Sequence, residues 1–455
     1  MRTLFRHSKP RALVIIAAAT FGLAPPVSAQ SEFPAAQAVR VPASRFARPG
    51  AEPLPFDLRS GIGPDEAAII ATYLNPALRS ARARRGLAVA QVIEAGVLPN
   101  PSVTYSRDYV TGGNTVGTQS AYNFNAGWEV TSLLPLIPKQ IAARANLRSV
   151  DLDIAWTEWQ TAEMARTAVY RLIALREQSS SARQAAGELG ESAKTLKRAV
   201  EAHEKTMIDY AAAESASQDA LATALGLEQE LQKQELLLKR TLGVPPEADV
   251  RLRSGIGLPS HVEAGSAQQL ADGLEDRRLD LLGLQQGYRS QDARVRAAIL
   301  EQFPKIAVGF AKASDTTNVH TQGFAITADL PVFNRNQGVL ATERATRQRL
   351  LDEYHQRVFE AKSDIATAIA DIRSLNRQIS AAERALPIFE QLVSSAGEAM
   401  QQGNTDVLAY YAARNSLLQK RVQIVRLKEQ LLEAETTLET ATGRFIPTNH
   451  AVHLR

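Results

Sequence analysis

The feature that most constrains this chain is an internal duplication. Residues 127–135 read Gly-Trp-Glu-Val-Thr-Ser-Leu-Leu-Pro and residues 323–331 read Gly-Phe-Ala-Ile-Thr-Ala-Asp-Leu-Pro, so Gly, Thr, Leu and Pro recur at a constant offset of 196. Two further anchors keep the same order: Leu98-Pro99 matches Phe303-Pro304 at an offset of 205, and Gly243 matches Gly443 at an offset of 200. A repeat of this length predicts one structural unit that is used twice.

The division of the chain follows from this duplication and from two stretches rich in proline and glycine. We expect a signal peptide at 1–29, an extended Pro-rich arm at 30–65, a first repeat at 66–243, a linker at 244–271, a second repeat at 272–443 and a C-terminal tail at 444–455. Residues 1–29 have a basic start, a short apolar stretch and small residues before Gln30, which is the pattern of a secretory signal.

Each repeat carries the same order of helical patterns. A shorter helix comes first, at 66–97 and at about 272–301, and two longer stretches follow, at 139–203 with 206–242 and at 338–402 with 406–442. Apolar residues recur every seven positions in two helices of the second repeat, which favours packing against a neighbouring helix. These residues are Leu274, Leu281, Tyr288 and Val295, then Leu417, Ile424, Leu431 and Leu438, with Leu418, Val425 and Leu432 beside them. Gly187, Gly190 and Pro387 should bend the long helices.

Between the helices, each repeat has a predicted β-hairpin, at 101–131 and at 304–331, in which apolar side chains alternate with polar or small ones. The strands are about ten residues long and carry aromatic residues near their ends, as strands that cross an outer membrane do. The residues predicted to face lipid are Tyr105, Tyr109, Tyr122, Phe124, Trp128, Phe324 and Ile326. Alternation alone would favour a soluble hairpin packed on the helices, and this alternative stays open at this point.

Two hairpins supply only four strands per chain, whereas membrane barrels need at least about eight strands to close. An open sheet edge in lipid leaves backbone groups without hydrogen bonds, at several kcal/mol for each group. If these strands lie in a membrane, several copies of the chain must therefore share one barrel.

Five short motifs stand in a fixed order within this duplicated plan. They are Asn75-Pro76-Ala77-Leu78, Leu98-Pro99-Asn100-Pro101, Leu134-Pro135, Leu330-Pro331 and Gly403-Asn404-Thr405-Asp406-Val407-Leu408. On these residues the chain resembles the TolC-like outer-membrane efflux protein family, from about residue 65 to residue 443. The first two motifs look most similar to the branch typified by the cobalt-zinc-cadmium resistance outer-membrane component.

The resemblance implies an α+β membrane protein. Three chains of a homotrimer would each contribute four strands to one twelve-stranded β-barrel, which is continued by a long α-helical tunnel in the periplasm. The implied function is that of a passive exit duct, the outer-membrane channel of a tripartite efflux system with an inner-membrane pump and a periplasmic adaptor protein. Two alternatives remain: a type I protein secretion exit channel, and a soluble periplasmic coiled-coil scaffold or adaptor. A duct needs no cofactor, and no sequence motif here indicates an enzyme.

The resemblance also places functional residues at the turns between the long helices. The carboxylate that follows the last turn in the family falls on Asp406, where three copies would surround a narrow pore and attract cations. The family's second carboxylate position falls on Ala409, and Asp209 occupies a comparable place in the first repeat. Either aspartate would also suit the first turn of a helix, an interpretation that we favour for Asp209. The adaptor-contacting tips are expected at Gly403, Asn404 and Thr405, and at Lys205 and Thr206.

Composition excludes several other partners. The formal net charge of +4 equals the charge of residues 1–29, so the remaining chain lacks the basic excess of a nucleic-acid-binding protein. The cysteine count is zero, which excludes thiolate metal sites and a lipid anchor on cysteine. His450 and His453 have no carboxylate nearby in the sequence, so we expect no metal site there. The expected location is the outer membrane, in contact with its lipid, with the helices in the periplasm and without lipidation.

Overall fold

The computed structural model describes residues 61–113, 116–402 and 407–444, and all of them belong to one compact unit, Val41–Arg455. The predicted signal peptide, most of the Pro-rich arm and of the C-terminal tail, and residues 403–406 of the last turn lie outside the described residues.

The first repeat holds the helices α1 (Pro64–Leu74), α2 (Pro76–Glu94), α3 (Leu136–Glu201) and α4 (Met207–Leu242). The expectation of one helix over 66–97 is wrong, because Pro76 divides it into α1 and α2. Proline has no N–H to donate and disfavours the helical conformation in the residue before it. Asn75 accordingly has φ −58° and ψ 121°. Its side-chain oxygen accepts a hydrogen bond from the backbone N–H of Ala77 at 2.8 Å and so caps α2.

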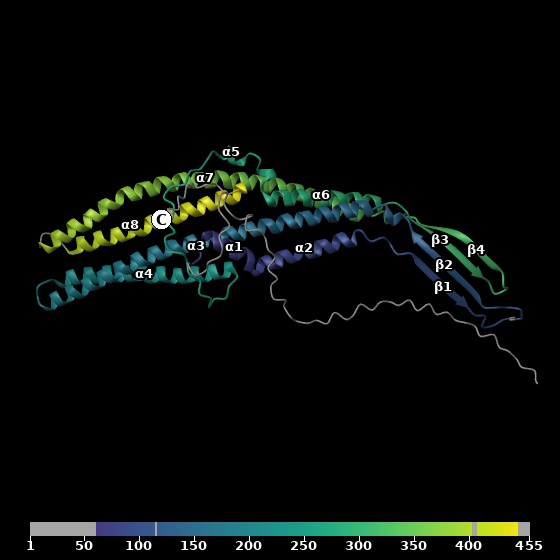
Figure 1. Ribbon diagram of the computed structural model, residues 1–455, viewed down its shortest axis with the longest axis horizontal. Coiled ribbons are helices and arrows are strands. Elements are labelled where there is room, and N and C mark those ends of the chain that lie inside the picture. Colours follow the sequence, from purple (N-terminus) through teal and green to yellow (C-terminus); the bar gives the residue numbers. More distant parts are fainter. Residues whose placement is uncertain (1–60, 114–115, 403–406, 445–455) are drawn as a thin grey trace, which may run out of the picture. The chain divides into compact units, whose positions relative to one another are not determined.

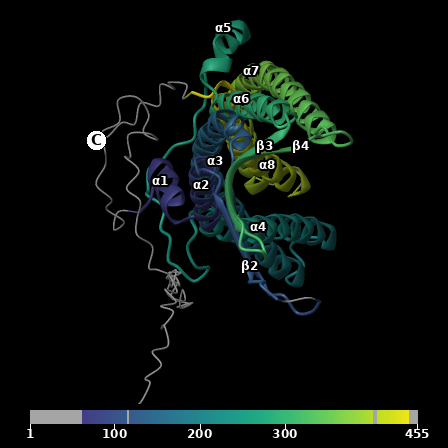
Figure 2. The same cartoon turned by 90° about the vertical axis from the view of Figure 1, so that its right-hand side faces the viewer.

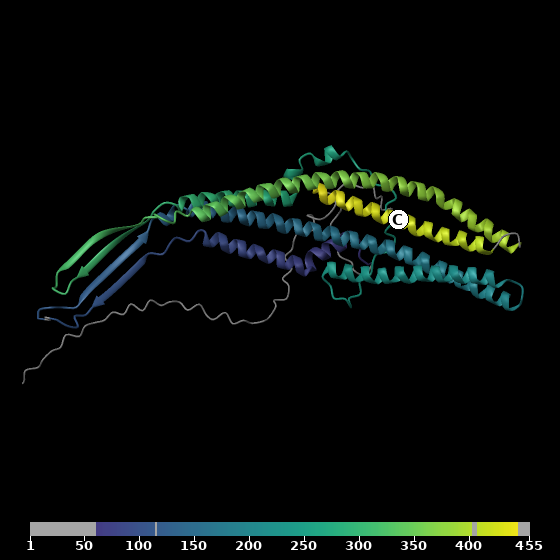
Figure 3. The same ribbon diagram turned by 180° about the vertical axis from the view of Figure 1, so that it is seen from behind.

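The second repeat holds α5 (Ala267–Ala271), α6 (Leu279–Leu300), α7 (Gln337–Gln401) and α8 (Val407–Thr442). The helix expected at about 272–301 begins later, at Leu279, because Gly273 has a positive φ of 66° and a 3₁₀ turn follows it at Leu274–Asp276. α7 remains helical through Pro387, and its ribbon curves along its length (Figures 1 and 3).

Four strands form one antiparallel sheet in the order β1-β2-β3-β4: β1 (Ser102–Asp108), β2 (Ala121–Glu129), β3 (Lys305–Ser314) and β4 (His320–Asp329). β2 pairs with β3, so the hairpins of the two repeats merge into a single sheet (Figure 2). Thr131, one of the duplicated residues, extends this pairing, because its hydroxyl accepts a hydrogen bond from the backbone N–H of Ile306 at 2.8 Å.

The long helices form two antiparallel pairs, α3 with α4 and α7 with α8, while α6 packs along α3 and α7 (Figures 1 and 3). α3 and α7 are 66 and 65 residues long, which corresponds to roughly 100 Å of helix each. Each begins a few residues after a strand, and each ends at a turn into its antiparallel partner. The sheet and the helical turns therefore lie at opposite ends of these two helices.

The apolar core lies between the helices. The seven-residue pattern of the second repeat is buried as expected: Leu281, Leu431 and Leu438 have no exposed surface, and they pack with α7 residues such as Ile365 and Ile372. Tyr288 and Leu417 are half-buried. A second cluster joins α3, α4 and α8, and a third joins α1, α3 and α4. The periodicity thus predicts the buried faces correctly.

The duplicated glycines Gly243 and Gly443 end α4 and α8 with positive φ angles of 75° and 67°. A Cβ atom on Gly243 would lie 2.5 Å from the carbonyl oxygen of Leu74, and one on Gly443 would lie 2.9 Å from Cγ of Arg278. Each glycine therefore ends a long helix against the start of a shorter helix of its own repeat. Gly243 lies against Leu74 and Asn75, just before α2, and Gly443 lies against Arg278, just before α6. Only glycine combines this conformation with so close an approach, which explains why it recurs in both repeats.

Part of the expected arm and linker is paired. Ile62 donates a backbone hydrogen bond to Arg251 at 2.8 Å and accepts one from Arg253 at 3.0 Å, so a short parallel bridge holds the start of α1 against residues 251–253. None of the helices in the described part of the chain is both long and apolar enough to cross a membrane.

Candidate functional site

The strand register places the apolar side chains of both hairpins on one face of the sheet. Directly paired residues of an antiparallel sheet project to the same face. Tyr105 pairs with Phe124, and Trp128 pairs with Val308, which in turn pairs with Ile326. By the same rule, this apolar face carries Val103, Tyr105, Tyr122, Phe124, Ala126, Trp128, Val308, Phe310, Phe324 and Ile326, and near the hairpin turns it also carries Arg107, Lys312, Ser314, His320 and Gln322. Phe324 and Ile326 are 92% and 77% exposed, so no described residue covers them.

Six of the seven residues that we expected to face lipid thus share this apolar face. The seventh, Tyr109, follows β1 and lies outside the strand, where its ring stacks with the guanidinium of Arg107 at 5.4 Å. Trp128 is half-buried, and its indole N–H donates a hydrogen bond to the carbonyl oxygen of Pro99 at 2.8 Å.

The opposite face of the sheet is polar or small. It carries Ser102, Thr104, Ser106, Asn123, Asn125, Gly127, Ala307, Gly309, Ala311, Thr321, Gly323, Ala325 and Thr327. Its carboxylates, those of Asp108, Glu129 and Asp329, stand at strand ends. Such a face suits contact with water, whereas its partner face suits contact with apolar groups.

Both edges of the sheet are open in the described chain. β1 pairs only with β2, and β4 pairs only with β3. The outward backbone N–H and C=O groups of these two strands are therefore free to pair with strands of other chains.

At the turn between α3 and α4, the structure shows a capping box. Thr206 precedes α4, and its hydroxyl accepts a hydrogen bond from Asp209 N–H at 3.2 Å. The Asp209 carboxylate accepts hydrogen bonds from the backbone N–H of Thr206 at 3.0 Å and from its hydroxyl at 2.9 Å. These hydrogen bonds, the backbone one first, lower the pKa of Asp209 below its ordinary value. Asp209 therefore has the capping role that we favoured for it.

The turn itself depends on a residue that sequence reasoning missed. His203 has a φ of 63°, a left-handed conformation that is uncommon outside glycine. Its position is 200 residues before Gly403, the same offset that relates Gly243 to Gly443. That offset was the signal that would have identified it. Lys205 is exposed beside it. Gly403, Asn404, Thr405 and Asp406, the predicted tip and constriction of the second repeat, lie outside the described residues.

A polar contact that the sequence did not indicate links the two helix pairs near these turns. Arg414 of α8 forms an ion pair with Glu188 of α3, and its guanidinium donates a hydrogen bond to the Tyr410 hydroxyl at 2.8 Å. The neighbouring Tyr411 is 3% exposed and packs in the cluster that contains Leu189 of α3. The last helix is thus fastened to the first repeat by both charge and packing.

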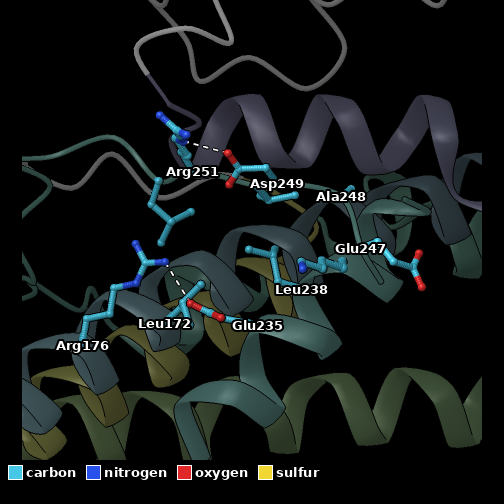
Figure 4. A pocket seen from close by; sticks show the side chains of 11 residues that line it. Leu172, Arg176, Glu235, Leu238, Glu247, Ala248, Asp249 and Arg251 are labelled. Carbon is cyan, nitrogen blue, oxygen red and sulfur yellow. Dashed lines mark hydrogen bonds and ion pairs between the residues drawn. The ribbon is translucent and has the colours of Figure 1, made fainter. Parts of the chain in front are cut away.

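A cavity of about 580 Å³ lies between α3, α4 and the linker (Figure 4). Four of its charged side chains form ion pairs: Arg176 with Glu235 at 3.0 Å, and Arg251 with Asp249 at 2.8 Å. Lys239 donates a hydrogen bond to the carbonyl oxygen of Pro246 at 2.6 Å. The remaining charged residue of the lining, Glu247, is exposed to solvent. Within the described ranges, no group of three His, Cys, Asp or Glu side chains is placed to hold a metal ion.

Residues 270–444 match the family described as outer membrane efflux protein. The match covers most of the second repeat. The resemblance to TolC-like outer-membrane efflux proteins that the sequence motifs predicted is therefore confirmed.

Two curated proteins are similar to part of this chain. The cation efflux system protein CusC of Escherichia coli (strain K12) is 28% identical over 177 residues, which cover 37% of this chain and 39% of CusC. The cobalt-zinc-cadmium resistance protein CzcC of Cupriavidus metallidurans is 24% identical over 177 residues, which cover 37% of this chain and 38% of CzcC. The matched segment spans less than half the length of these curated relatives.

The structural likeness to solved proteins extends further along the chain than the sequence match. A crystal structure of CusC superposes with a TM-score of 0.70 at 20% identity and covers 88% of this chain and 98% of that chain. Because this coverage reaches into both repeats, the likeness shows that the first repeat shares the fold as well.

Proposed function

We propose that this chain is the outer-membrane channel of a tripartite efflux system, a passive exit duct that spans the outer membrane as a homotrimer. The observation that carries the proposal is the sheet: one face is apolar, the other is polar or small, and both edges are open. A soluble protein of this architecture would leave Phe324 and Ile326 in water.

The strand lengths support a membrane position. β3 and β4 have 10 residues each, or about 33 Å of strand. Tilted by about 45°, such strands cross the apolar core of an outer membrane. Four strands are too few for a closed barrel, so three copies joined edge to edge through β1 and β4 would give twelve strands and leave no unpaired edge. The polar face would line the barrel and the apolar face would meet outer-membrane lipid.

The long helices would form the periplasmic tunnel below this barrel. Their turns, roughly 100 Å from the sheet, would form the mouth. There we place Asp406 and Asp209 at the constriction, and Gly403, Asn404 and Thr405, with Lys205 and Thr206, at the contact with a periplasmic adaptor protein. The energy for transport would come from an inner-membrane pump. With no cysteine for a lipid anchor, the trimer would be held in the outer membrane by its barrel alone.

The proposed cargo is a metal cation. CusC is named a cation efflux protein and CzcC a cobalt-zinc-cadmium resistance protein. A ring of carboxylates at the mouth would suit cations, because like charges around a narrow passage attract ions of opposite sign.

Membrane fractionation tests the proposal. The full-length protein, expressed in a Gram-negative host, should require detergent for extraction and should have the mass of three chains by light scattering after correction for detergent. In planar bilayers it should form ion-conducting pores. Recovery as a soluble monomer would overturn the proposal.

A further inference from the structure

The apolar face of the sheet changes character along the strands. In the three rows nearest the helices, all residues are apolar: Ile306 with Ala328, then Trp128, Val308 and Ile326, then Val103, Ala126, Phe310 and Phe324. The next row contains Tyr105, Phe124, Lys312 and Gln322, and the last row contains Arg107, Tyr122, Ser314 and His320. Basic and amphipathic side chains thus follow an uninterrupted apolar band, at the end of the sheet that carries the hairpin turns.

The charge on this face has one sign. Arg107 and Lys312 are exposed, and the ion pairs between described residues include neither of them. Among the described strand residues, every carboxylate projects from the opposite face. The nearest turn does contain Asp315, but its carboxylate already accepts hydrogen bonds from Thr317 N–H and Val319 N–H at 2.9 Å each.

Local contacts orient Arg107 and Tyr122. The guanidinium of Arg107 donates hydrogen bonds to the Ser120 hydroxyl at 3.1 and 2.9 Å, and it stacks with the ring of Tyr109 at 5.4 Å. The Tyr122 hydroxyl lies 3.5 Å from Nδ1 of His320. Aromatic residues with a polar tip gather where an apolar interior meets an aqueous surface. The aromatic residues and the basic residues therefore both indicate that the membrane boundary lies at the hairpin-turn end of the sheet.

We propose that Arg107 and Lys312, flanked by Tyr105 and Tyr122, bind the phosphate groups of anionic lipid in the leaflet at the hairpin-turn end of the sheet. This inference rests on the proposed function, since it requires the apolar face to meet lipid. Long basic side chains at a membrane boundary extend their charged ends to the headgroups. Arg107 lies on β1 and Lys312 lies on β3, with β2 between them, and their rows are adjacent. Their Cα atoms are therefore roughly 12 Å apart. That spacing allows each to bind its own phosphate, so a lipid with two phosphates would suit the pair.

Lipid retention tests the inference on the full-length trimer. The protein is reconstituted into nanodiscs of phosphatidylcholine that contain a minor fraction of bisphosphorylated lipid A, released into detergent, and the bound lipids are counted by native mass spectrometry. The wild type should retain lipid A over phosphatidylcholine. Lys312→Gln should reduce retention about fivefold, and adding Arg107→Gln should reduce it about fivefold again. Lys312→Arg should restore it, and raising the salt concentration should weaken it.

The matched control is Lys305→Gln, which also removes one positive charge but projects from the opposite face at the helix end of β3. It should retain lipid A as the wild type does. A trimer that inserts normally but retains lipid A equally in the wild type and the double variant would overturn this inference alone. Failure of the wild type to insert would overturn it together with the proposed function. Displacement of lipid A by millimolar inorganic phosphate would show a site for free phosphate and would also overturn it.

Discussion

The side-chain amide of Asn75 donates a hydrogen bond to the carbonyl oxygen of Thr241, 2.9 Å away, and so fastens the break between α1 and α2 to the last turn of α4. The same side chain caps α2 through Ala77. One residue thus connects the first and last helices of the first repeat.

Replacing Asn75 should therefore destabilise the helical part. Asn75→Ala removes a helix cap and a hydrogen bond between segments, and we expect a loss of about 1–3 kcal/mol in the free energy of unfolding. Denaturant unfolding in detergent, followed by helical circular dichroism, measures it. Asn146→Ala serves as the control, because Asn146 makes an exposed side-chain hydrogen bond to Gln91. Equal effects of the two substitutions would contradict the assigned role.

Gly243→Ala should be more damaging than an ordinary substitution at a positive φ. The new Cβ would meet the Leu74 carbonyl oxygen at 2.5 Å in addition to the strain of φ 75°. We expect a loss of about 2–4 kcal/mol. Gly255→Ala is the matched control, since Gly255 has φ 83° but no atom within 4 Å of an added Cβ. Gly255→Ala should lower the free energy of unfolding by only about 1–2 kcal/mol. If the two substitutions were equally damaging, the close approach of Gly243 to α1 would be unimportant.

Arg278→Ala should leave the buried carboxylate of Asp280 with only the longer contact to the guanidinium of Arg357, 3.5 Å away. Arg278 binds Asp280 through two hydrogen bonds of 2.9 and 2.6 Å, and both side chains are 7% exposed. We expect a loss of about 3–5 kcal/mol. Arg251→Ala, from an exposed pair with Asp249, should cost no more than about 1 kcal/mol. The double variant Arg278→Met with Asp280→Leu should be more stable than Arg278→Ala; if it were less stable, the unpaired charge would not be the cause.

The capping box predicts a pH dependence at the α3–α4 turn. The folded pKa of Asp209 is lowered, so its stabilising effect is fully present above its unfolded value of about 3.9 and is lost as pH falls through the folded value. Asp209→Asn should therefore be less stable than the wild type at neutral pH, by about 1 kcal/mol or less because the site is exposed. The difference should begin to shrink below about pH 4 and vanish once the pH is below the folded pKa of Asp209. Asp219→Asn, at an exposed α4 position, is the control, and a difference that persists in acid would argue against the cap.

The proposed constriction gives a functional prediction. Asp406→Asn should lower the cation-to-anion permeability ratio of single channels by about twofold or more at low salt, because a focused field concentrates counter-ions roughly tenfold or more. Reversal potentials across a salt gradient measure the ratio. Asp272→Asn removes one negative charge per chain beside α5, far along the sequence from the turn, and should leave the ratio unchanged. Unchanged selectivity in Asp406→Asn would reject its role at the constriction.

Much of the architecture could be predicted because it depends on local periodicity. The predicted long helices 139–203 and 338–402 correspond to α3 and α7 within a few residues at each end. The hairpin predicted at 101–131 corresponds to β1 at Ser102–Asp108 and β2 at Ala121–Glu129. In these segments, apolar residues recur with the period of the backbone itself, 3.6 residues in a helix and 2 residues in a strand. The expectation of a single helix at 66–97 was wrong because Pro76 interrupts the apolar pattern that the two helices share.

The candidate site was predictable only in part. Within each strand, the aromatic residues were expected to face one way. Whether the two hairpins share that face depends on the pairing of β2 with β3, in which Tyr122 pairs with Ser314, a residue far away in the sequence. His203, which turns the chain with a positive φ, and the contact of Arg414 with Glu188 were not anticipated. The Arg414–Glu188 contact depends on two helices that come together only when the chain is folded, whereas the offset of 200 residues from Gly403 was the sequence signal for His203.

The sequence by itself determined the duplicated plan, the helical and strand periods and the existence of an apolar and a polar strand face, because each of these follows from short-range order along the chain. The tertiary structure decided which segments meet. The pairing of β2 with β3 joins the repeats, Gly243 abuts Leu74, and Arg414 forms an ion pair with Glu188. The physical reason is that strand pairing and close packing depend on distances between residues far apart in sequence, whereas sequence patterns report only the preferences of neighbours.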